Sequence, residues 1–127
     1  MTRFALDASA LLAVVRDERG AAMVADRMPG ALMSTVNASE AIMRGMENGF
    51  PFEVLQSLIV YRQIELVAFD WDLAQAAAKL RPATKSRGLS FADRACLALA
   101  IREGTTVLTA DRAWAGLDLP CPIELVR

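Results

Sequence analysis

The chain has 127 residues, of which 54% are hydrophobic, and its 14 basic and 15 acidic residues leave a formal net charge of −1. This length suits one domain with a buried core, and so apolar a composition excludes an intrinsically disordered chain. The sequence contains no histidine, which excludes Ser-His-Asp and Cys-His catalysis and zinc sites of the HExxH type. The net charge also provides no global positive field to attract a nucleic acid.

Short apolar runs and helical patterns alternate along the chain. In chain order we predict a strand at residues 3–7, helices at 9–16 and 20–27, a strand at 31–34, helices at 36–48 and 51–61, a strand at 64–69, helices at 70–81 and 91–103, and strands at 105–108 and 123–126. Gly49 and Gly104 are expected to end two of the helices, and Pro51 suits a first helical turn. Residues 82–90 are predicted to form a loop that leads into Asp93.

Strands that alternate with helices, without a tight hairpin signal, predict parallel βαβ units with helices on both faces of the sheet. We therefore expect residues 1–127 to form a single α/β domain, a three-layer α/β/α arrangement around a mostly parallel five-stranded sheet. In such a fold the carboxyl ends of the strands and the amino ends of the helices lie at one edge of the sheet. Ligands of these folds bind at that edge.

We expect a cytoplasmic protein that does not cross a membrane. The longest apolar candidate, residues 8–15, is far too short to span a bilayer, and Asp7 interrupts the N-terminal apolar stretch, unlike a signal peptide. Cys96 and Cys121 lack the spacing of a zinc site, and we expect them to be buried or idle thiols.

Four acidic residues are predicted to meet at the ligand-binding edge of the sheet. Asp7 ends the first strand, Glu40 lies in the first turn of the third helix, Asp93 lies in the first turn of the last helix, and Asp111 comes just past the fourth strand. For Glu40 and Asp93 taken singly, a capping role at a helix start is the better explanation of an acid. We do not expect Asp7 to be a cap, because Ser9 is the better N-cap residue.

Asp93 has a further argument in its favour. The segment FADRACLALAI is apolar nearly all round, so its helix is expected to be buried. An unpaired carboxylate on such a helix costs several kcal/mol. Four carboxylates gathered at one place repel each other without a cation, which should raise the pKa of at least one of them.

An all-oxygen set of ligands, with neither histidine nor cysteine, favours Mg²⁺ or Mn²⁺ over Zn²⁺. The chemistry that follows from acids and such an ion is metal-assisted hydrolysis of a phosphodiester.

Four segments of the sequence resemble the motifs of the PIN-domain ribonucleases, and specifically the VapC toxins of type II toxin–antitoxin systems. They occur in the order of the family and read LDASALLA at 6–13, NASE at 37–40, LSFADRACLALA at 89–100 and LTADRAW at 108–114. The resemblance implies that the metal-binding and catalytic acids are Asp7, Glu40, Asp93 and Asp111.

Two hydroxyl residues follow the same motifs. The resemblance implies that Ser9 and Thr109 orient Asp7, Asp111 or a water at the metal; a role as helix N-caps is an equally good explanation. Trp114 is expected to pack in the core below the site, with base stacking as the less favoured alternative.

The resemblance also implies an activity and partners. It implies an endoribonuclease that cleaves structured RNA such as tRNA or rRNA, that forms a homodimer, and that is neutralised in a hetero-oligomer with a cognate VapB-like antitoxin. The helices at 20–27 and 51–61 are candidates for the apolar groove that takes the antitoxin, although a core role explains their apolar residues better. These residues are Met23, Met28, Leu55, Leu58 and Ile59.

Twelve of the 14 basic residues are arginine, whose planar fork suits phosphate. Candidates for RNA phosphate contacts lie in the segments that lead to or from the acids, where solvated loop charges are the alternative. They are Arg81, Lys85, Arg87 and Arg112. Arg16 ends the first helix, where a cation suits the helix dipole, so we assign it a structural role.

Two other functions compete with the nuclease. A phospho-acceptor receiver domain is disfavoured because Asp7 is followed by Ala8 and Ser9 and not by a second acid. A PIN fold that binds RNA or protein with little or no cleavage stays open as the alternative.

Overall fold

The structure, a computed structural model, describes residues 3–127, so that residues 1–2 of the predicted domain lie outside the described residues. In chain order the elements are β1 (Phe4–Leu6), α1 (Ala8–Val15), α2 (Ala21–Arg27), β2 (Leu32–Ser34), α3 (Thr35–Glu47), α4 (Phe52–Tyr61), β3 (Glu65–Val67), α5 (Trp71–Lys79), α6 (Arg81–Thr84), the 3-10 turn η1 (Lys85–Arg87), α7 (Phe91–Glu103), β4 (Thr106–Thr109), the 3-10 turn η2 (Arg112–Trp114) and β5 (Ile123–Leu125). The predicted strands and helices are all present, with ends that differ by a few residues.

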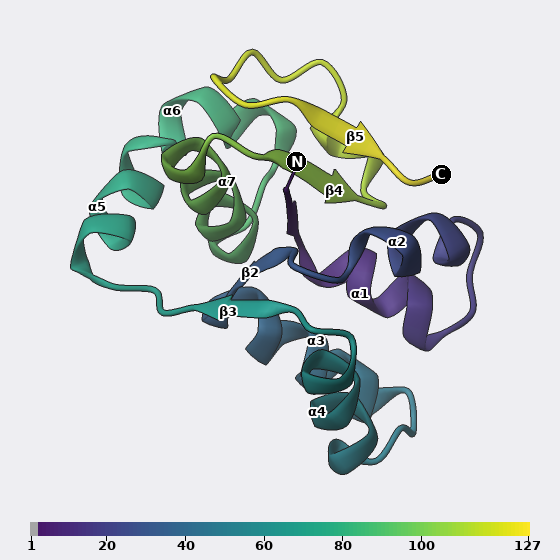
Figure 1. The fold of residues 1–127 in the computed structure, drawn as a ribbon. Helices are drawn as coiled ribbons and strands as arrows, with labels where there is room; N and C mark the ends of the chain where they lie inside the picture. Colours follow the sequence, from purple (N-terminus) through teal and green to yellow (C-terminus); the bar gives the residue numbers. More distant parts are fainter. Residues whose placement is uncertain (1–2) are drawn as a thin grey trace.

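The five strands form one sheet in the order β3-β2-β1-β4-β5 (Figure 1). All four pairs of neighbouring strands are parallel, which confirms the expectation from the alternating elements. β1 lies at the centre, where Ala5 pairs with Leu32 of β2 and with Val107 of β4. Asp7, the residue after the central strand, therefore lies in the middle of the carboxyl edge of the sheet.

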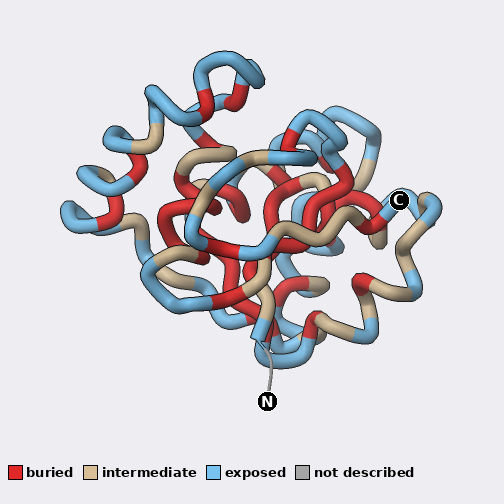
Figure 2. The backbone as a smooth tube through the Cα atoms, turned by 90° about the horizontal axis from the view of Figure 1, so that it is seen from above, coloured by how far each residue is buried: buried red, intermediate tan, exposed pale blue. Residues whose placement is uncertain are grey.

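Side chains alternate between the two faces of the sheet, as they must along a strand. On one face, Leu6 and Leu108 pack in a cluster that includes buried residues of α1, α2, α3 and α4. On the other face, Ala5 and Val107 pack against α7, and Leu32 packs against α5 and α7. Figure 2 shows the buried residues running through the middle of the molecule and the exposed ones around it. The predicted three-layer α/β/α arrangement around a parallel five-stranded sheet is confirmed.

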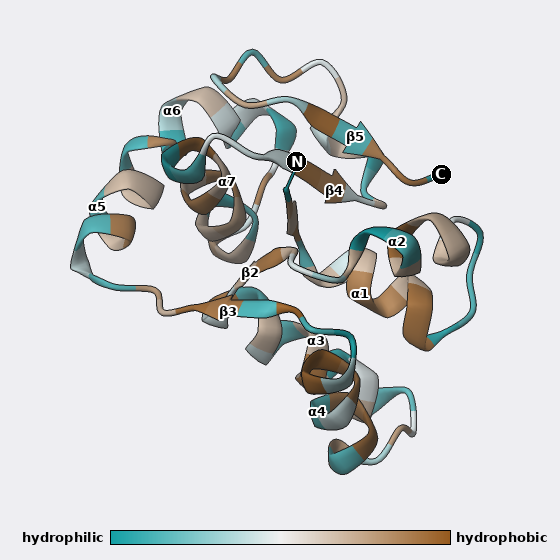
Figure 3. Ribbon diagram, in the orientation of Figure 1, coloured by the Kyte–Doolittle hydropathy of each residue, from teal (hydrophilic) through white to brown (hydrophobic). Residues whose placement is uncertain are grey.

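α1 and α7 pack on opposite faces of the sheet. Their sequences explain why they form helices at these places. α1 reads ASALLAVV and is apolar along most of its length (Figure 3). α7 starts with a capping box between Ser90 and Asp93 and ends at Gly104, which has a φ of 64°. The capping box and the glycine stop are the signals that predicted these two ends.

The prediction of a loop at residues 82–90 was wrong over most of its length. The chain forms α6 and η1 there, and the helix predicted at 70–81 ends at Lys79 in α5. Pro82 is accommodated because it lies in the first turn of α6, where its missing N–H has no helical partner to lose. The Thr84 hydroxyl donates to the Leu80 carbonyl at 2.8 Å and so ties this short helix to the end of α5.

In residues 3–127, none of the helices combines the length and the apolar character that a bilayer crossing requires.

Candidate active site

The four predicted acids line one cavity of about 170 Å³ at the carboxyl edge of the sheet. Asp7 follows β1 and Asp111 follows β4, while α3 and α7 bring Glu40 and Asp93 to the same place. The residues that line the cavity are Asp7, Ala8, Ser9, Glu40, Arg44, Ser90, Asp93 and Asp111. Four separate segments of the chain thus contribute one carboxylate each.

Asp7 is the most deeply placed of these carboxylates, with 3% of its surface exposed. Ser9 Oγ donates to its Oδ1 at 2.7 Å, Thr109 Oγ1 donates to its Oδ2 at 2.5 Å, and the Ala10 amide donates to Oδ1 at 2.9 Å. Both carboxylate oxygens are therefore held in place.

Burial raises the pKa of Asp7 from 3.8 to about 6, and the three hydrogen bonds and the nearby charge of Asp93 modify that rise. The hydrogen bonds from Thr109, Ser9 and Ala10 lower the pKa, and the negative charge of Asp93 raises it a little further. A raised pKa among the acids was expected, but repulsion between carboxylates is its smallest cause and desolvation its largest.

The prediction that Asp7 is not a cap was wrong. Asp7 is the N-cap of α1, with an extended backbone (φ −87°, ψ 176°) and a side chain that accepts from the Ala10 amide. Ser9 lies inside α1, so it does not cap that helix. Asp7 is the one residue between β1 and α1, so it follows the strand and also caps the helix.

The two predicted hydroxyl residues meet around Asp7. Ser9 Oγ lies 3.3 Å from Thr109 Oγ1, and Thr109 is fully buried. Ser9 Oγ accepts from the Ala110 amide at 2.9 Å, and Thr109 Oγ1 accepts from the Asp111 amide at 3.0 Å. Neither hydroxyl caps a helix. Their geometry orients Asp7 and joins the ends of β1 and β4.

Glu40 lies in the second turn of α3, not in the first as predicted. The reason is that Ser34 at the end of β2 caps the helix, accepting from the Val36 amide at 3.2 Å, so that α3 starts at Thr35. A capping role for Glu40 is thereby excluded. Its carboxylate lies 3.6 Å from Nη2 of Arg44, one turn further along α3.

Asp93 and Asp111 both serve as caps while they line the cavity. The Ser90 amide donates to Asp93 Oδ2 at 2.8 Å and the Asp93 amide donates to Ser90 Oγ at 3.2 Å, a reciprocal capping box. Asp111 Oδ1 accepts from the Ala113 amide at 2.9 Å at the start of η2. The structural and the functional explanations of these acids are compatible, because a cap bond fixes the carboxylate at the edge of the cavity.

The donor set fits a hard divalent cation that keeps water or substrate oxygens among its ligands. Within residues 3–127, no three Asp, Glu or Cys side chains lie close enough together to hold an ion unaided. Mg²⁺ is commonly held by one or two carboxylates, with waters and phosphate oxygens as its other ligands. The buried Asp7 with its neighbour Asp93 supplies such a carboxylate pair.

The four basic residues predicted to contact RNA lie in different settings. Arg81 in α6 and Lys85 in η1 are exposed. Arg87 donates to the carbonyl oxygens of Ala113 and Ala115 and so ties η1 to the segment after β4. Arg112 lines a second cavity that adjoins the acids.

Three arginines that the sequence did not single out for the site lie beside it. The second cavity, of about 320 Å³, is lined by Ser9, Leu12, Arg16, Glu18, Arg44, Ala110, Asp111, Arg112 and Arg127. Arg16 ends α1 as predicted, and it also lines this second cavity. Helical spacing is a signal for Arg44, which lies four residues after Glu40 and so on the same face of α3.

Trp114 is fully buried and packs with Cys121 in the cluster around α7, which excludes base stacking. Cys96 and Cys121 are free and buried, as expected.

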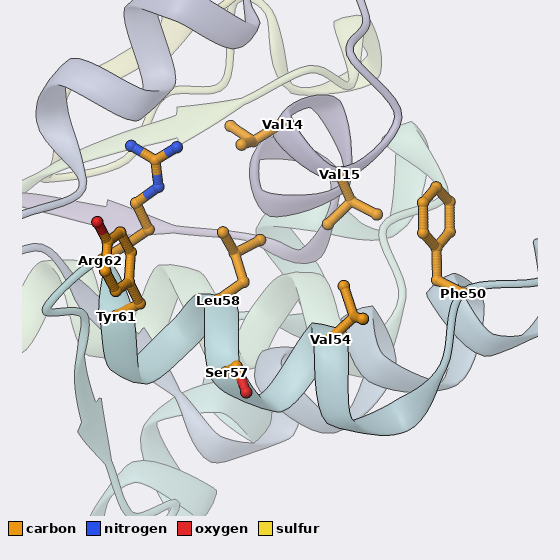
Figure 4. Close-up of a pocket in the computed structure, with 8 residues that line it drawn as sticks. All are labelled: Val14, Val15, Phe50, Val54, Ser57, Leu58, Tyr61 and Arg62. Atoms are coloured by element: carbon orange, nitrogen blue, oxygen red, sulfur yellow. The ribbon is translucent and has the colours of Figure 1, made fainter.

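The apolar residues predicted to line a groove differ in how deeply they are buried. Met28, Leu55 and Ile59 are buried in the core, and Met23 packs against it. Leu58 also packs against the core, and it lines a cavity of about 450 Å³ between α1 and α4 (Figure 4). That cavity is lined by Val14, Val15, Phe50, Val54, Ser57, Leu58, Tyr61 and Arg62.

Comparison with known proteins gives one family and a group of similar folds. The family model described as PIN domain matches residues 4–119. No curated protein matches the sequence significantly.

Three solved structures share most of the fold. A toxin–antitoxin complex from Klebsiella pneumoniae is 17% identical with a TM-score of 0.72, and the match covers 97% of this chain and 100% of that one. The DNA-bound VapBC from Salmonella typhimurium is 18% identical with a TM-score of 0.70, and the match covers 100% of both chains. The sarcin–ricin-loop-cleaving toxin VapC20 from Mycobacterium tuberculosis is 17% identical with a TM-score of 0.72, covering 91% and 96%. At these identities the likeness shows the fold.

Proposed function

Because this chain belongs to the PIN domain family, we propose that it is a Mg²⁺- or Mn²⁺-dependent endoribonuclease of the cytoplasm and the toxin of a type II toxin–antitoxin pair. The observation that carries the proposal is the single cavity at the sheet edge that Asp7, Glu40, Asp93 and Asp111 line from four separate segments. The solved toxins of similar fold support it, and one of them is described as cleaving the sarcin–ricin loop. A structured RNA such as tRNA or rRNA is therefore the proposed substrate.

The four acids are the proposed ligands of the cation, directly or through bound water, because no three Asp, Glu or Cys side chains within residues 3–127 lie close enough together to hold an ion unaided. A divalent ion held by these carboxylates supplies a Lewis acid for the phosphate and lowers the pKa of water. The chain's own contribution is to fix the carboxylates in advance. Thr109 and Ser9 each donate to a different oxygen of Asp7, and the capping bond from the Ser90 amide holds Asp93. Since the chain has no histidine and carboxylates line the cavity, carboxylates and water are the proposed carriers of the protons of the reaction.

The proposed protein partner is a VapB-like antitoxin, in a hetero-oligomer that also contains a homodimer of this chain. The apolar cavity between α1 and α4 (Figure 4) is its proposed seat, because an amphipathic helix binds in such a groove. For the homodimer, the exposed apolar residues Leu66, Trp71 and Phe91 are candidates for contacts between the two copies.

The test of the nuclease uses purified chain freed of antitoxin, incubated with total RNA in Mg²⁺, in Mn²⁺ or in EDTA. We expect discrete fragments that require the metal. Asp7→Asn and Asp93→Asn should abolish them, because each removes a negative charge from the cation site. Asp118→Asn is the matched control, since Asp118 is an exposed acid outside the cavity.

Equal cleavage by wild type and both site variants would assign the activity to a contaminant. The alternative function is a PIN fold that binds RNA or protein with little or no cleavage. It is favoured by the absence of any three Asp, Glu or Cys side chains close enough to hold an ion among the described residues 3–127. RNA binding without cleavage across total RNA in both metals would establish that alternative.

A further inference from the structure

The arginine-lined cavity beside the acids adjoins the candidate active site. It shares Ser9, Arg44 and Asp111 with the acidic cavity. We call it the arginine pocket and define it by its basic residues Arg16, Arg44, Arg112 and Arg127. A strand that enters the acidic cavity between these shared residues would lie next to the arginine pocket.

The charge of the arginine pocket is opposite to that of the whole chain. Four guanidinium groups line it, against the two carboxylates of Glu18 and Asp111, while the chain as a whole carries −1. Arg16 follows α1 and Arg44 lies in α3. Arg112 lies in η2, and Arg127 comes after β5. A chain with no global positive field needs such a local concentration of charge to hold RNA.

Two of the arginines are held by one glutamate. Arg16 Nη1 lies 3.9 Å and Arg127 Nη1 lies 3.3 Å from the carboxylate of Glu18. Arg16 Nε also donates to Asn48 Oδ1 at 2.7 Å. Each guanidinium has five N–H donors, so these contacts orient the groups and leave donors for a ligand.

The C-terminal end reaches this place because of a glycine. Gly20 has a φ of 93°, and a Cβ added there would lie 2.2 Å from the carbonyl oxygen of Val126. The Val126 amide donates to the Thr109 carbonyl at 2.9 Å. The last residue, Arg127, is therefore fixed against the segment that carries Glu18 and next to the end of β4.

We propose that the arginine pocket binds a backbone phosphate of the RNA strand adjacent to the phosphate that is cleaved. The proposal rests on the proposed nuclease function and deepens it by naming where the strand runs. An arginine fork matches the oxygens of a phosphate in two parallel hydrogen bonds. The acidic cavity carries four carboxylates, whereas the arginine pocket that adjoins it carries four guanidinium groups, so a second phosphate of the strand is attracted to the arginine pocket.

Glu18 makes the proposal testable in two directions. If Arg16 and Arg127 bind a phosphate, Glu18 competes with that phosphate, and removal of its charge strengthens RNA binding. The alternative is that Arg16, Glu18 and Arg127 only hold Arg127 against the segment before α2. Removal of the Glu18 charge would then loosen this contact and weaken RNA binding, as the arginine variants do.

The experiment measures the Kd of total tRNA by filter retention in Mg²⁺, over a series of salt concentrations, with all variants in an Asp7→Asn background so that no cleavage occurs. We expect Arg127→Ala and Arg112→Ala each to raise the Kd about tenfold, the loss of one charge-assisted hydrogen bond, and to reduce the salt slope by about 1. Glu18→Gln should lower the Kd about twofold to fivefold, the range of an exposed ion pair. Arg19→Ala is the matched control, an exposed arginine that does not line the pocket, and should leave the Kd unchanged.

An unchanged Kd and salt slope in both arginine variants would overturn the proposal, and so would a Glu18→Gln variant that weakens binding. Arg112 is exposed and lies in η2, so its variant keeps the test valid should Arg127→Ala fail to fold. Polyglutamate is measured beside tRNA, and loss of polyglutamate binding with tRNA binding retained would assign the pocket to an acidic protein and overturn the proposal. Cleavage of total RNA by the chain with Asp7 restored is scored separately. Absence of cleavage would refute the proposed nuclease function. Unchanged Kd and salt slope in the binding series would refute the phosphate-binding role of the arginine pocket.

Discussion

Asp7 destabilises the fold whenever it is ionised without a cation. Its pKa is raised by burial from 3.8 to about 6. A carboxyl whose folded pKa lies above its unfolded value favours folding when protonated, and that contribution is lost as the pH rises from about 4 through about 6. At pH 8 the whole cost is present, at most about 3 kcal/mol for a shift of this size.

We therefore predict that Asp7→Asn raises the melting temperature at pH 8 in EDTA, and that its advantage over wild type shrinks at pH 4.5. Circular dichroism melts at both pH values provide the measurement. Asp118→Asn, an exposed acid, should show no such change with pH. A lower melting temperature for Asp7→Asn at both pH values would mean that the hydrogen bonds from Ser9 and Thr109 outweigh the cost of burial.

The convergence of the four acids on one cavity was readable from the sequence, while their local roles were not. Strand ends and helix starts share one edge of a parallel sheet, so any fold of this type brings Asp7 and Asp111 together. Which residue caps α1, however, depends on where the strand stops and the helix begins. Asp7 and Ser9 are both good caps, and only the backbone conformation distinguishes them.

At the scale of elements, the start of α7 joins stability to the site. Ser90 accepts from the Asp93 amide, and the Ser90 amide holds the Asp93 carboxylate. We predict that Ser90→Ala lowers the free energy of unfolding by about 1 kcal/mol, the usual cost of losing a cap. It should also lower the rate of metal-dependent RNA cleavage, because the loss of the Ser90 Oγ bond to the Asp93 amide loosens the first turn of α7, which carries Asp93.

Urea unfolding and cleavage of total RNA are the two measurements for Ser90. Ser90→Thr is the matched control, since a threonine hydroxyl also caps and should retain most of both properties. Loss of stability in Ser90→Ala with cleavage unaffected would separate the cap from the site.

Element boundaries were the weaker part of the sequence prediction. Residues 82–90 contain proline, serine and glycine and indicate a loop, yet Pro82 fits a first helical turn and the chain continues as α6 and η1. Glu40 was placed a turn too early because Ser34, at the end of β2, is the cap of α3. In both places several good local signals compete, and tertiary context decides among them.

At the scale of the whole molecule, the layer order followed from the alternation of strands and helices, but the arginine pocket did not. Arg16, Arg44, Arg112 and Arg127 are far apart in sequence, and each alone suits a solvated helix end or chain terminus. They meet because β5 lies beside β4 and Gly20 admits the C-terminal end. Long-range contacts of this kind leave no periodic pattern to read.

The cation links these scales, since it would bind the folded site and not the unfolded chain. An ion that binds only the native state raises stability by RT ln(1 + [L]/Kd), about 2.7 kcal/mol at a hundredfold excess over Kd. We predict that millimolar Mn²⁺ raises the melting temperature of wild type at pH 7.5 and not that of Asp7→Asn or Asp93→Asn. Asp118→Asn should keep the full shift.

Because protons compete with metal for Asp7, whose pKa is about 6, the shift in melting temperature should also be smaller at pH 5. A wild-type protein that melts at the same temperature with and without millimolar Mn²⁺ at pH 7.5 would exclude a metal site at these four carboxylates.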